Sequence, residues 1–282
     1  MDVSIIIVNY NTKDLTMQCI DSVIEKTTDV KYEIILVDNA SADGSVAALK
    51  AKYNDIIVIE SPTNLGFGRA NNLGVKSASG KYLFFLNSDT ILLNNAISEF
   101  LHYCKENNNI GCVGAWLKDE DHEYTHSYGY FPTFTNVLLP FAAKKEICKA
   151  NYYSTKVEYL TGAAMFVPSE VFLEIGGFHS SFFMYYEETF MQYNIKKMGL
   201  ERVVINTPEI LHLEGKSYMK KKSNLKRMDV TNSLLTYMSL VCNSTQYKAF
   251  LILFKIIKLR AMLNCYFTFK ENKSYYYGIL KK

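Results

Sequence analysis

YLFFLNSDT, residues Tyr82–Thr90, is the stretch from which the fold is best inferred. The apolar and aromatic run Tyr82–Leu86 is typical of a β-strand that is buried on both faces. The run stops at Asn87, Ser88 and Asp89, so a carboxylate stands at the end of an apolar strand. A lone acid there is most often a turn or cap residue, and the surrounding elements decide whether it has another role.

The segments before this strand alternate between strand and helix patterns. We expect strands at Val3–Val8, Tyr32–Val37, Ile56–Glu60 and Tyr82–Leu86, and helices at Asp14–Glu25, Ser45–Lys52 and Gly68–Ser77. This alternation predicts an α/β fold with a mainly parallel, Rossmann-like sheet flanked by helices. Ligands of such sheets bind outside the carboxyl ends of the strands. Asp38 and Asp89 follow two of these ends, so we expect both carboxylates to face one crevice.

The second part of the chain has a less regular pattern. We expect helices at Asn94–Cys104, Ser169–Ile175 (capped by Ser169) and Glu187–Met198, strands at Cys112–Leu117 and Val157–Val167, and a strand-like run Val203–Ile205 before a turn at Pro208. Beyond Leu213 a basic segment, 216–227, precedes helices at Met228–Val241 and Gln246–Leu263. The sequence therefore predicts a domain over 1–215, with halves 1–93 and 94–215, and a helical extension over 216–282.

Composition excludes several classes of function. The net charge of +3 gives no sign of a nucleic-acid partner. The six cysteines are scattered without a CxxC pair, which predicts neither a zinc site nor a disulfide framework. We read no signal peptide and no run of roughly 20 apolar residues that could span a bilayer, so we expect a cytoplasmic location.

Glycine-rich phosphate loops are weakly represented. The segment 66–71 matches only part of the dinucleotide fingerprint, and Asn9–Asp14, after the first strand, contains no glycine. A sugar-phosphate nucleotidyltransferase would need a glycine-rich, basic loop there, so that alternative ranks last. A phosphate ligand would have to be held by side chains and a hard divalent cation, which Asp89 could bind.

Two further features carry candidate chemistry. In the segment Phe182–Glu188, aromatic residues precede the carboxylates Glu187 and Glu188, whose pKa such surroundings would raise toward that of a general base. The competing interpretation is a pair of first-turn acids favoured by the helix dipole. His212 alone would most often be structural, but with Asp89 it would complete a divalent-metal pair that suits manganese better than magnesium.

Several motifs occur in a fixed order along the chain. They are Val3–Asn11, Val37–Ser45, Asn64–Gly68, Leu86–Asp89, Gly162–Met165, Gly176–Phe178, Phe182–Glu188 and His212. Together they resemble the family 2 inverting glycosyltransferases of GT-A fold, especially the rhamnosyltransferase-like branch. The resemblance covers roughly Val3 to Ser217.

The resemblance implies a role for each candidate residue. Asp89, in the DxD-type position that begins here with Asn87, would bind Mn²⁺ or Mg²⁺ on the sugar-nucleotide diphosphate, completed by His212. Glu188 would be the base, with Glu187 beside it. The residues expected to contact the nucleotide sugar are Val8, Tyr10, Asn11, Asp38, Asn39, Asn64, Gly66, Asn71, Asn87, Ser88 and Lys216. Residues 1–93 would bind the donor and 94–215 the acceptor.

The resemblance also implies partners, and it has departures. The donor would be dTDP-rhamnose or a UDP-hexose, and the acceptor a glycan or a lipid-linked sugar in cell-surface polysaccharide assembly. Phe190 and Asn194 stand where the branch often has an aspartate and an arginine, and Glu188 is one methylene longer than the usual aspartate. These departures keep open a second hypothesis, a catalytically impaired homologue that binds nucleotide sugar or glycan.

The C-terminal extension offers two basic features. Lys216–Arg227 is a solvated loop, a cover for the donor diphosphate or a contact for anionic lipid. The segment Tyr247–Leu263 is apolar but carries lysines on one side. It is expected to pack on the catalytic domain, to join two copies in a homodimer, or to bind peripherally to an anionic membrane such as the inner face of the plasma membrane.

Overall fold

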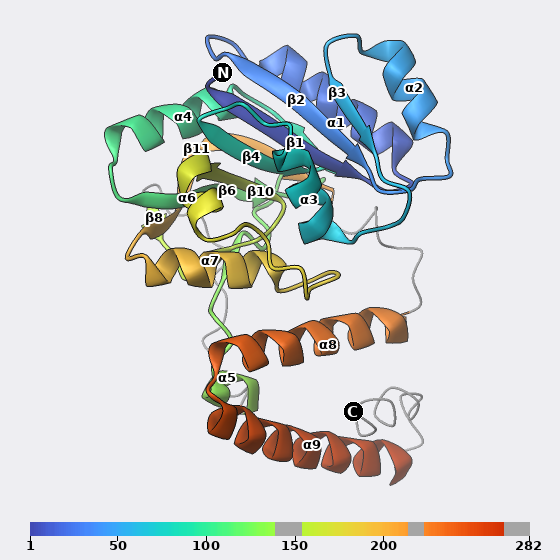
Figure 1. The fold of residues 1–282 in the computed structure, drawn as a ribbon, viewed down its shortest axis with the longest axis vertical. Coiled ribbons are helices and arrows are strands. Elements are labelled where there is room, and N and C mark those ends of the chain that lie inside the picture. The colour runs from blue at the N-terminus through green and yellow to red at the C-terminus, as the bar shows by residue number, and fades with distance from the viewer. Residues whose placement is uncertain (139–153, 214–222, 268–282) are drawn as a thin grey trace. The chain divides into compact units, whose positions relative to one another are not determined.

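The computed structural model describes residues 1–138, 154–213 and 223–267 (Figure 1). The chain divides into two compact units, which are described separately below. Unit 1 takes its described residues from Met1–Phe131, Glu146–Phe183 and Glu187–Met219, and unit 2 from Pro132–Lys145, Met184–Tyr186 and Lys220–Lys282.

The first part of unit 1 follows the strand and helix alternation expected from the sequence. Its elements are β1 (Val3–Asn9), α1 (Lys13–Lys26), β2 (Tyr32–Asp38), α2 (Ser45–Lys52), β3 (Ile57–Glu60), α3 (Phe67–Val75) and β4 (Tyr82–Asn87). The strands are parallel and lie in the order β3-β2-β1-β4. Asn9 pairs with Asp38, and Val8 pairs with Asn87, so the polar ends of three strands meet at one edge of the sheet.

The sheet continues beyond β4 with mixed strand directions. The further elements of unit 1 are β5 (Thr90–Leu92), α4 (Ala96–Glu106), β6 (Ile110–Lys118), β7 (Tyr128–Gly129), β8 (Thr155–Lys156), β9 (Tyr159–Leu160), β10 (Ala164–Pro168), α6 (Ser169–Glu174), α7 (Glu187–Lys197) and β11 (Glu201–His212). β10 runs antiparallel to both β4 and β6, whereas β11 runs parallel to β6. The predicted α/β class with a mostly parallel sheet is confirmed.

Three local predictions were wrong. The expected strand Val157–Val167 is interrupted, because Val157 bonds to the Arg202 carbonyl and a turn around Gly162 separates β9 from β10. No turn occurs at Pro208, because β11 runs through it. Pro208 has no N–H to donate to β6, and the pairing of the two strands shifts register there. The Ser169 hydroxyl does not cap α6 but donates to the Gly80 carbonyl at 2.6 Å.

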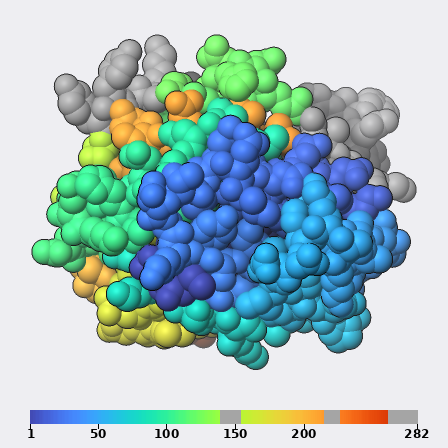
Figure 2. All heavy atoms as spheres, turned by 90° about the horizontal axis from the view of Figure 1, so that it is seen from above, coloured from blue at the N-terminus to red at the C-terminus, as the bar shows by residue number. Residues whose placement is uncertain are grey.

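Alternating residues of the strands fill two apolar layers. Ile5 and Ile7 of β1 belong to the core that includes residues of α1, α2 and α4, while Ile6 belongs to the core that includes residues of α6 and α7. Both faces of the sheet are therefore covered, which explains the continuous apolar runs in the sequence. The blue N-terminal residues of unit 1 pack into one continuous surface in the space-filling view (Figure 2).

Unit 2 is helical and contains α5 (Phe134–Leu138), α8 (Ser223–Val241) and α9 (Ser244–Phe267). The Phe134 ring meets Phe250 edge-on at 6.0 Å, and the Ser233 hydroxyl donates to the Met184 carbonyl at 2.7 Å. Within the described part of the chain, every helix is too short or too polar to cross a membrane.

Candidate functional site

Asn9, at the end of β1, organises the polar edge of the sheet. Its side-chain amide donates to Asp38 Oδ1 at 2.7 Å, Ser45 Oγ at 2.8 Å and Ser41 Oγ at 3.0 Å. Its side-chain oxygen, Oδ1, accepts from the Thr12 hydroxyl at 2.9 Å. Asn9 is fully buried, so this network fixes the loop after β2 against the start of α1.

Asp38 is held inside this network. Its second carboxylate oxygen accepts the Ser41 N–H at 2.9 Å, and the residue is 3% exposed. A carboxylate has about four acceptor positions, so after the bonds from Asn9, Ser41 and Ser45 it keeps capacity for one more donor. The contact of Asp38 with a pyrimidine base therefore stays a prediction.

The other residues expected around the base lie close to this loop. Asn11 has a left-handed backbone (φ 55°), and its side chain accepts the Ala42 N–H at 2.8 Å. Tyr10 is 46% exposed and Val8 is half-buried. Tyr10 thus presents a ring to solvent beside the ordered loop, where it is accessible to a ligand.

A second polar cluster joins the end of β2 to the start of α3. The Asn39 amide donates to Asn64 Oδ1 at 3.0 Å, and Asn64 Oδ1 also accepts the Gly66 N–H at 2.9 Å. Gly66 has φ +78°, and a Cβ there would collide with the Phe183 carbonyl oxygen. Asn71 is buried and donates to the Phe67 carbonyl within α3 at 3.1 Å, so that bond occupies part of its amide in stabilising the helix.

The segment after β4 carries the expected metal ligand. The Asn87 N–H donates to the Ala163 carbonyl at 2.9 Å, and the Ser88 hydroxyl lies 3.1 Å from that of Thr12. Asp89 is 3% exposed, and its Oδ1 lies 3.5 Å from His212 Nε2 at the end of β11. The structure therefore brings together Asp89 and His212, which are separated by most of the unit in sequence.

The hydrogen bonds of the His212 imidazole bear on whether Asp89 and His212 could bind a divalent ion. His212 Nδ1 is buried and has no hydrogen-bond partner among the described residues. Those residues contain no cluster of three or more side chains able to hold a metal. Mn²⁺ and Mg²⁺ commonly take one or two protein ligands and complete their coordination with phosphate oxygens and water. Asp89 and His212 are therefore of the ligand types that such an ion takes, and their role as metal ligands stays a prediction.

Glu187 and Glu188, which begin α7, have different surroundings. Glu187 is 3% exposed, and its Cβ lies 3.3 Å from where a Cβ on Gly68 would stand, so it packs against α3. Glu188 is half-buried, and its Cγ lies 3.6 Å from the corresponding position on Gly162. Successive helix residues point about 100° apart, which explains the division.

The electrostatics of Glu188 match those of a general base. Burial raises the pKa of this carboxyl, partly offset by the Thr189 hydroxyl, which donates at 3.3 Å, and by the His126 imidazole. Desolvation is the main cause of this increase in pKa. Gln192, one turn further along α7, bonds both ways to the Leu160 backbone and so holds the helix next to the Gly162 turn.

Sequence reasoning missed Asn9 and left other positions open. Asn9 follows an apolar run just as Asn87 does, and that parallel was the available signal. Phe190, which departs from the family pattern, is a buried member of an aromatic cluster with Phe182 and His179. Lys216 lies outside the described residues.

Comparisons with known proteins show the family to which the chain belongs. Residues 4–172 match the sequence family described as glycosyl transferase family 2. A poly(ribitol-phosphate) beta-glucosyltransferase of Bacillus spizizenii is 38% identical over 112 residues, which are 38% of this chain and 18% of that protein. An N-acetylglucosaminyl-diphospho-decaprenol L-rhamnosyltransferase of Mycobacterium tuberculosis is 24% identical over 67% of this chain and 69% of its own length. Rhamnosyltransferase WbbL of Escherichia coli is 26% identical over 66% and 74%, respectively.

Solved structures show the same fold. GalNAc-T7 with UDP, GalNAc and Mn²⁺ superposes with a TM-score of 0.64 at 18% identity, over 88% of this chain and 49% of that chain. The mannosyltransferase PcManGT of Pyrobaculum calidifontis, in complex with GDP-Man and Mn²⁺, gives 0.60 at 15% identity, over 98% and 85%. The chain thus spans about a fifth of the Bacillus relative and about half of GalNAc-T7. The expected GT-A fold is confirmed, and the chain belongs to glycosyl transferase family 2.

Proposed function

We propose that this chain is an inverting glycosyltransferase that moves a sugar from a nucleoside-diphosphate donor to an acceptor hydroxyl. One observation carries the proposal. Glu188, with its raised pKa, lies beside Gly162, and the next residue, Ala163, binds the backbone of Asn87 at the strand end that leads to Asp89. A base for the acceptor and ligands for the diphosphate therefore belong to one connected piece of structure.

Asp89 and His212 would hold a divalent ion, Mn²⁺ or Mg²⁺, against the donor diphosphate. When bound, such an ion neutralises the charge that develops on the leaving phosphate. Tyr10, Asp38 and the ordered loop between them would receive the nucleotide base. The Asn64–Gly66 turn would approach the ribose and phosphates through its backbone.

Glu188 would act on the acceptor. Its carboxylate accepts the proton of the acceptor hydroxyl while the hydroxyl oxygen bonds to the anomeric carbon. The bond from that carbon to the diphosphate oxygen breaks, and its electron pair leaves with the diphosphate. A single displacement inverts the anomeric configuration and needs only one base. A raised pKa strengthens that base at neutral pH.

The names of two relatives support a choice of donor sugar and acceptor. Two of the relatives are named as rhamnosyltransferases, which favours dTDP-rhamnose as donor, with a UDP-hexose as the alternative. The Mycobacterium relative is named for a diphospho-decaprenol acceptor, which supports a lipid-linked or glycan acceptor here. This role in cell-surface polysaccharide assembly would place the enzyme at the cytoplasmic face of a membrane.

The test is a transfer and donor-hydrolysis assay with a panel of sugar nucleotides and Mn²⁺. Glu188→Gln should lower the rate by about 10²–10⁴-fold while donor binding persists, because proton transfer by a positioned base is worth that much. Asp89→Ala should lose both binding and turnover. Glu174→Gln, an exposed acid on α6, is the control and should behave like the wild type. Saturable donor binding without turnover by the wild-type chain would instead establish the catalytically impaired homologue.

A further inference from the structure

Helix α9 of unit 2 exposes an unusual amount of apolar surface. We define its apolar face as Ile252, Leu253, Ile256, Ile257 and Leu259. All five side chains are exposed, and Ile252 is 62% exposed. At 100° per residue these positions fall on an arc of about 160°, within which the exposed Arg260 also lies. Exposed apolar side chains gathered on one side of a helix mark an interaction surface.

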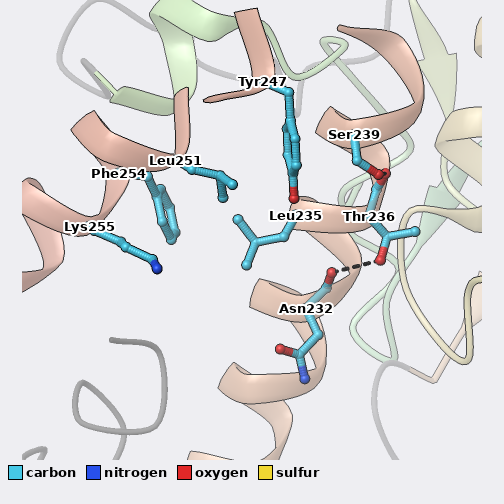
Figure 3. Close-up of a pocket in the computed structure, with 8 residues that line it drawn as sticks. All are labelled: Asn232, Leu235, Thr236, Ser239, Tyr247, Leu251, Phe254 and Lys255. Carbon is cyan, nitrogen blue, oxygen red and sulfur yellow. Dashed lines mark hydrogen bonds between the residues drawn. The ribbon is translucent and has the colours of Figure 1, made fainter. Parts of the chain in front are cut away.

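The other sides of α9 are occupied within unit 2. Phe250 and Phe254 are buried and stack on each other at 5.5 Å, and Phe250 also meets Phe134 of α5. On a further side, Tyr247 and Leu251 line a cleft of about 300 Å³ opposite α8 (Figure 3). The apolar face is therefore additional to the surface that α9 uses for packing.

The charged residues of α9 indicate which kind of partner its apolar face contacts. Between Ser244 and Phe267 the helix contains Lys248, Lys255, Lys258 and Arg260 and no acidic residue. Lys248 and Arg260 are exposed, and Lys255 reaches the rim of the cleft in Figure 3. Long basic side chains can lay their methylenes along an apolar surface while the charged ends stay in a polar layer.

We propose that α9 lies in the headgroup layer of an anionic membrane, with its apolar face against the acyl chains and its basic residues against lipid phosphates. A second copy of the chain is a poorer partner. Two-fold pairing through this face would bring two basic helices together with no acid on either. The proposal does not depend on the transferase reaction.

The experiment uses the full chain and sedimentation with phosphatidylcholine vesicles, with and without phosphatidylglycerol. The protein should bind the anionic vesicles at low salt and leave them as salt is raised. Ile252→Ser/Ile256→Ser should weaken binding by at least about tenfold, since two apolar side chains lose their burial. Lys248→Gln/Arg260→Gln should reduce both binding and its salt dependence. Leu173→Ser removes a 66% exposed leucine from α6 and should change nothing.

Two outcomes would overturn the proposal. In the first, the wild-type chain ignores anionic vesicles at low salt. In the second, light scattering shows a dimer in the absence of lipid, and Ile252→Ser/Ile256→Ser dissociates it, so that the face joins two copies. Circular dichroism and thermal denaturation should show that each variant is folded. Transfer to a water-soluble acceptor should persist in these variants, which separates failure of the membrane proposal from failure of the transferase proposal.

Discussion

Replacing Glu188 with glutamine should make the protein more stable at neutral pH while it lowers the rate of transfer by about 10²–10⁴-fold. Burial raises the pKa of Glu188 above the ordinary value of 4.5, so the folded chain disfavours the carboxylate that catalysis requires. Glutamine has nearly the same shape and no charge. The substitution therefore removes the free-energy cost of holding a carboxylate beside Phe67 and Gly162.

The direction of the pH dependence follows from proton binding. Above pH 4.5 the unfolded chain has released the Glu188 proton, whereas the folded chain keeps it until its higher pKa is reached. The wild type therefore loses free energy of unfolding as pH rises through that interval, and the loss is complete above the folded pKa. Each tenfold weakening of ionisation by folding is worth about 1.4 kcal/mol. Below pH 4.5 both states of the wild type are protonated, and the glutamine variant should have nearly the same stability.

Urea denaturation of the wild type, Glu188→Gln and the control Glu174→Gln across the acid-to-neutral range measures this difference. The stabilisation by Glu188→Gln should grow from near zero in acid to a plateau at neutral pH, while Glu174→Gln stays level. A constant difference in stability at every pH would show that burial does not raise the pKa of Glu188. A variant that transfers sugar at the wild-type rate would show that Glu188 is not the base.

Three further substitutions test other parts of the site. Asp89→Asn should abolish the Mn²⁺-dependent stabilisation by a nucleoside diphosphate, which for the wild type is about 2.7 kcal/mol at a hundred times the dissociation constant, measured by thermal shift. Gly66→Ala should cost more than the roughly 1–3 kcal/mol of a strained backbone with φ 78° and ψ −175°, because its Cβ also meets the Phe183 carbonyl. Gly199→Ala, with φ +79° and open space around it, is the control without a clash in urea denaturation. Asn9→Ala should destabilise by about 1–3 kcal/mol by leaving a buried carboxylate under-bonded, and should weaken nucleotide binding in a titration; unchanged stability would contradict the role assigned to the Asn9 network.

The first part of the fold could be predicted because three of its four strands, β1, β2 and β4, are mostly buried on both faces. A continuous apolar run followed by a helical pattern has few other interpretations, and the strands from Val3 to Asn87 lie where the runs indicated. The second part contains antiparallel strands and short bridges, whose pairing depends on residues distant in sequence. The strand through Pro208 could not be predicted locally. Proline lacks the N–H that a strand normally donates, and β11 accommodates this by a register shift against β6 between Ile205 and Ile210.

The candidate site shows the same contrast. Asp89 and His212 were predicted as a pair, and their 3.5 Å separation agrees, because strand ends place such residues at a common edge. Burial of polar groups was harder to foresee. Asn71 was an expected site residue and Asn9 was not, yet both are buried and bonded within the protein. Sequence indicates where a polar residue stands, whereas its available hydrogen-bonding capacity depends on the folded neighbours.

The adjacent glutamates show why that distinction decides the mechanism. Two carboxylates in sequence could be taken for a pair that shares one proton, as two acids must when they lie close together. The start of α7 separates them instead, since Glu187 packs against Gly68 of α3 while Glu188 stands by the Gly162 turn. Of these two carboxylates, the proposed mechanism therefore assigns the base to Glu188 alone. A single displacement with inversion needs one base and is compatible with this separation, whereas a shared-proton mechanism would need the two carboxylates side by side.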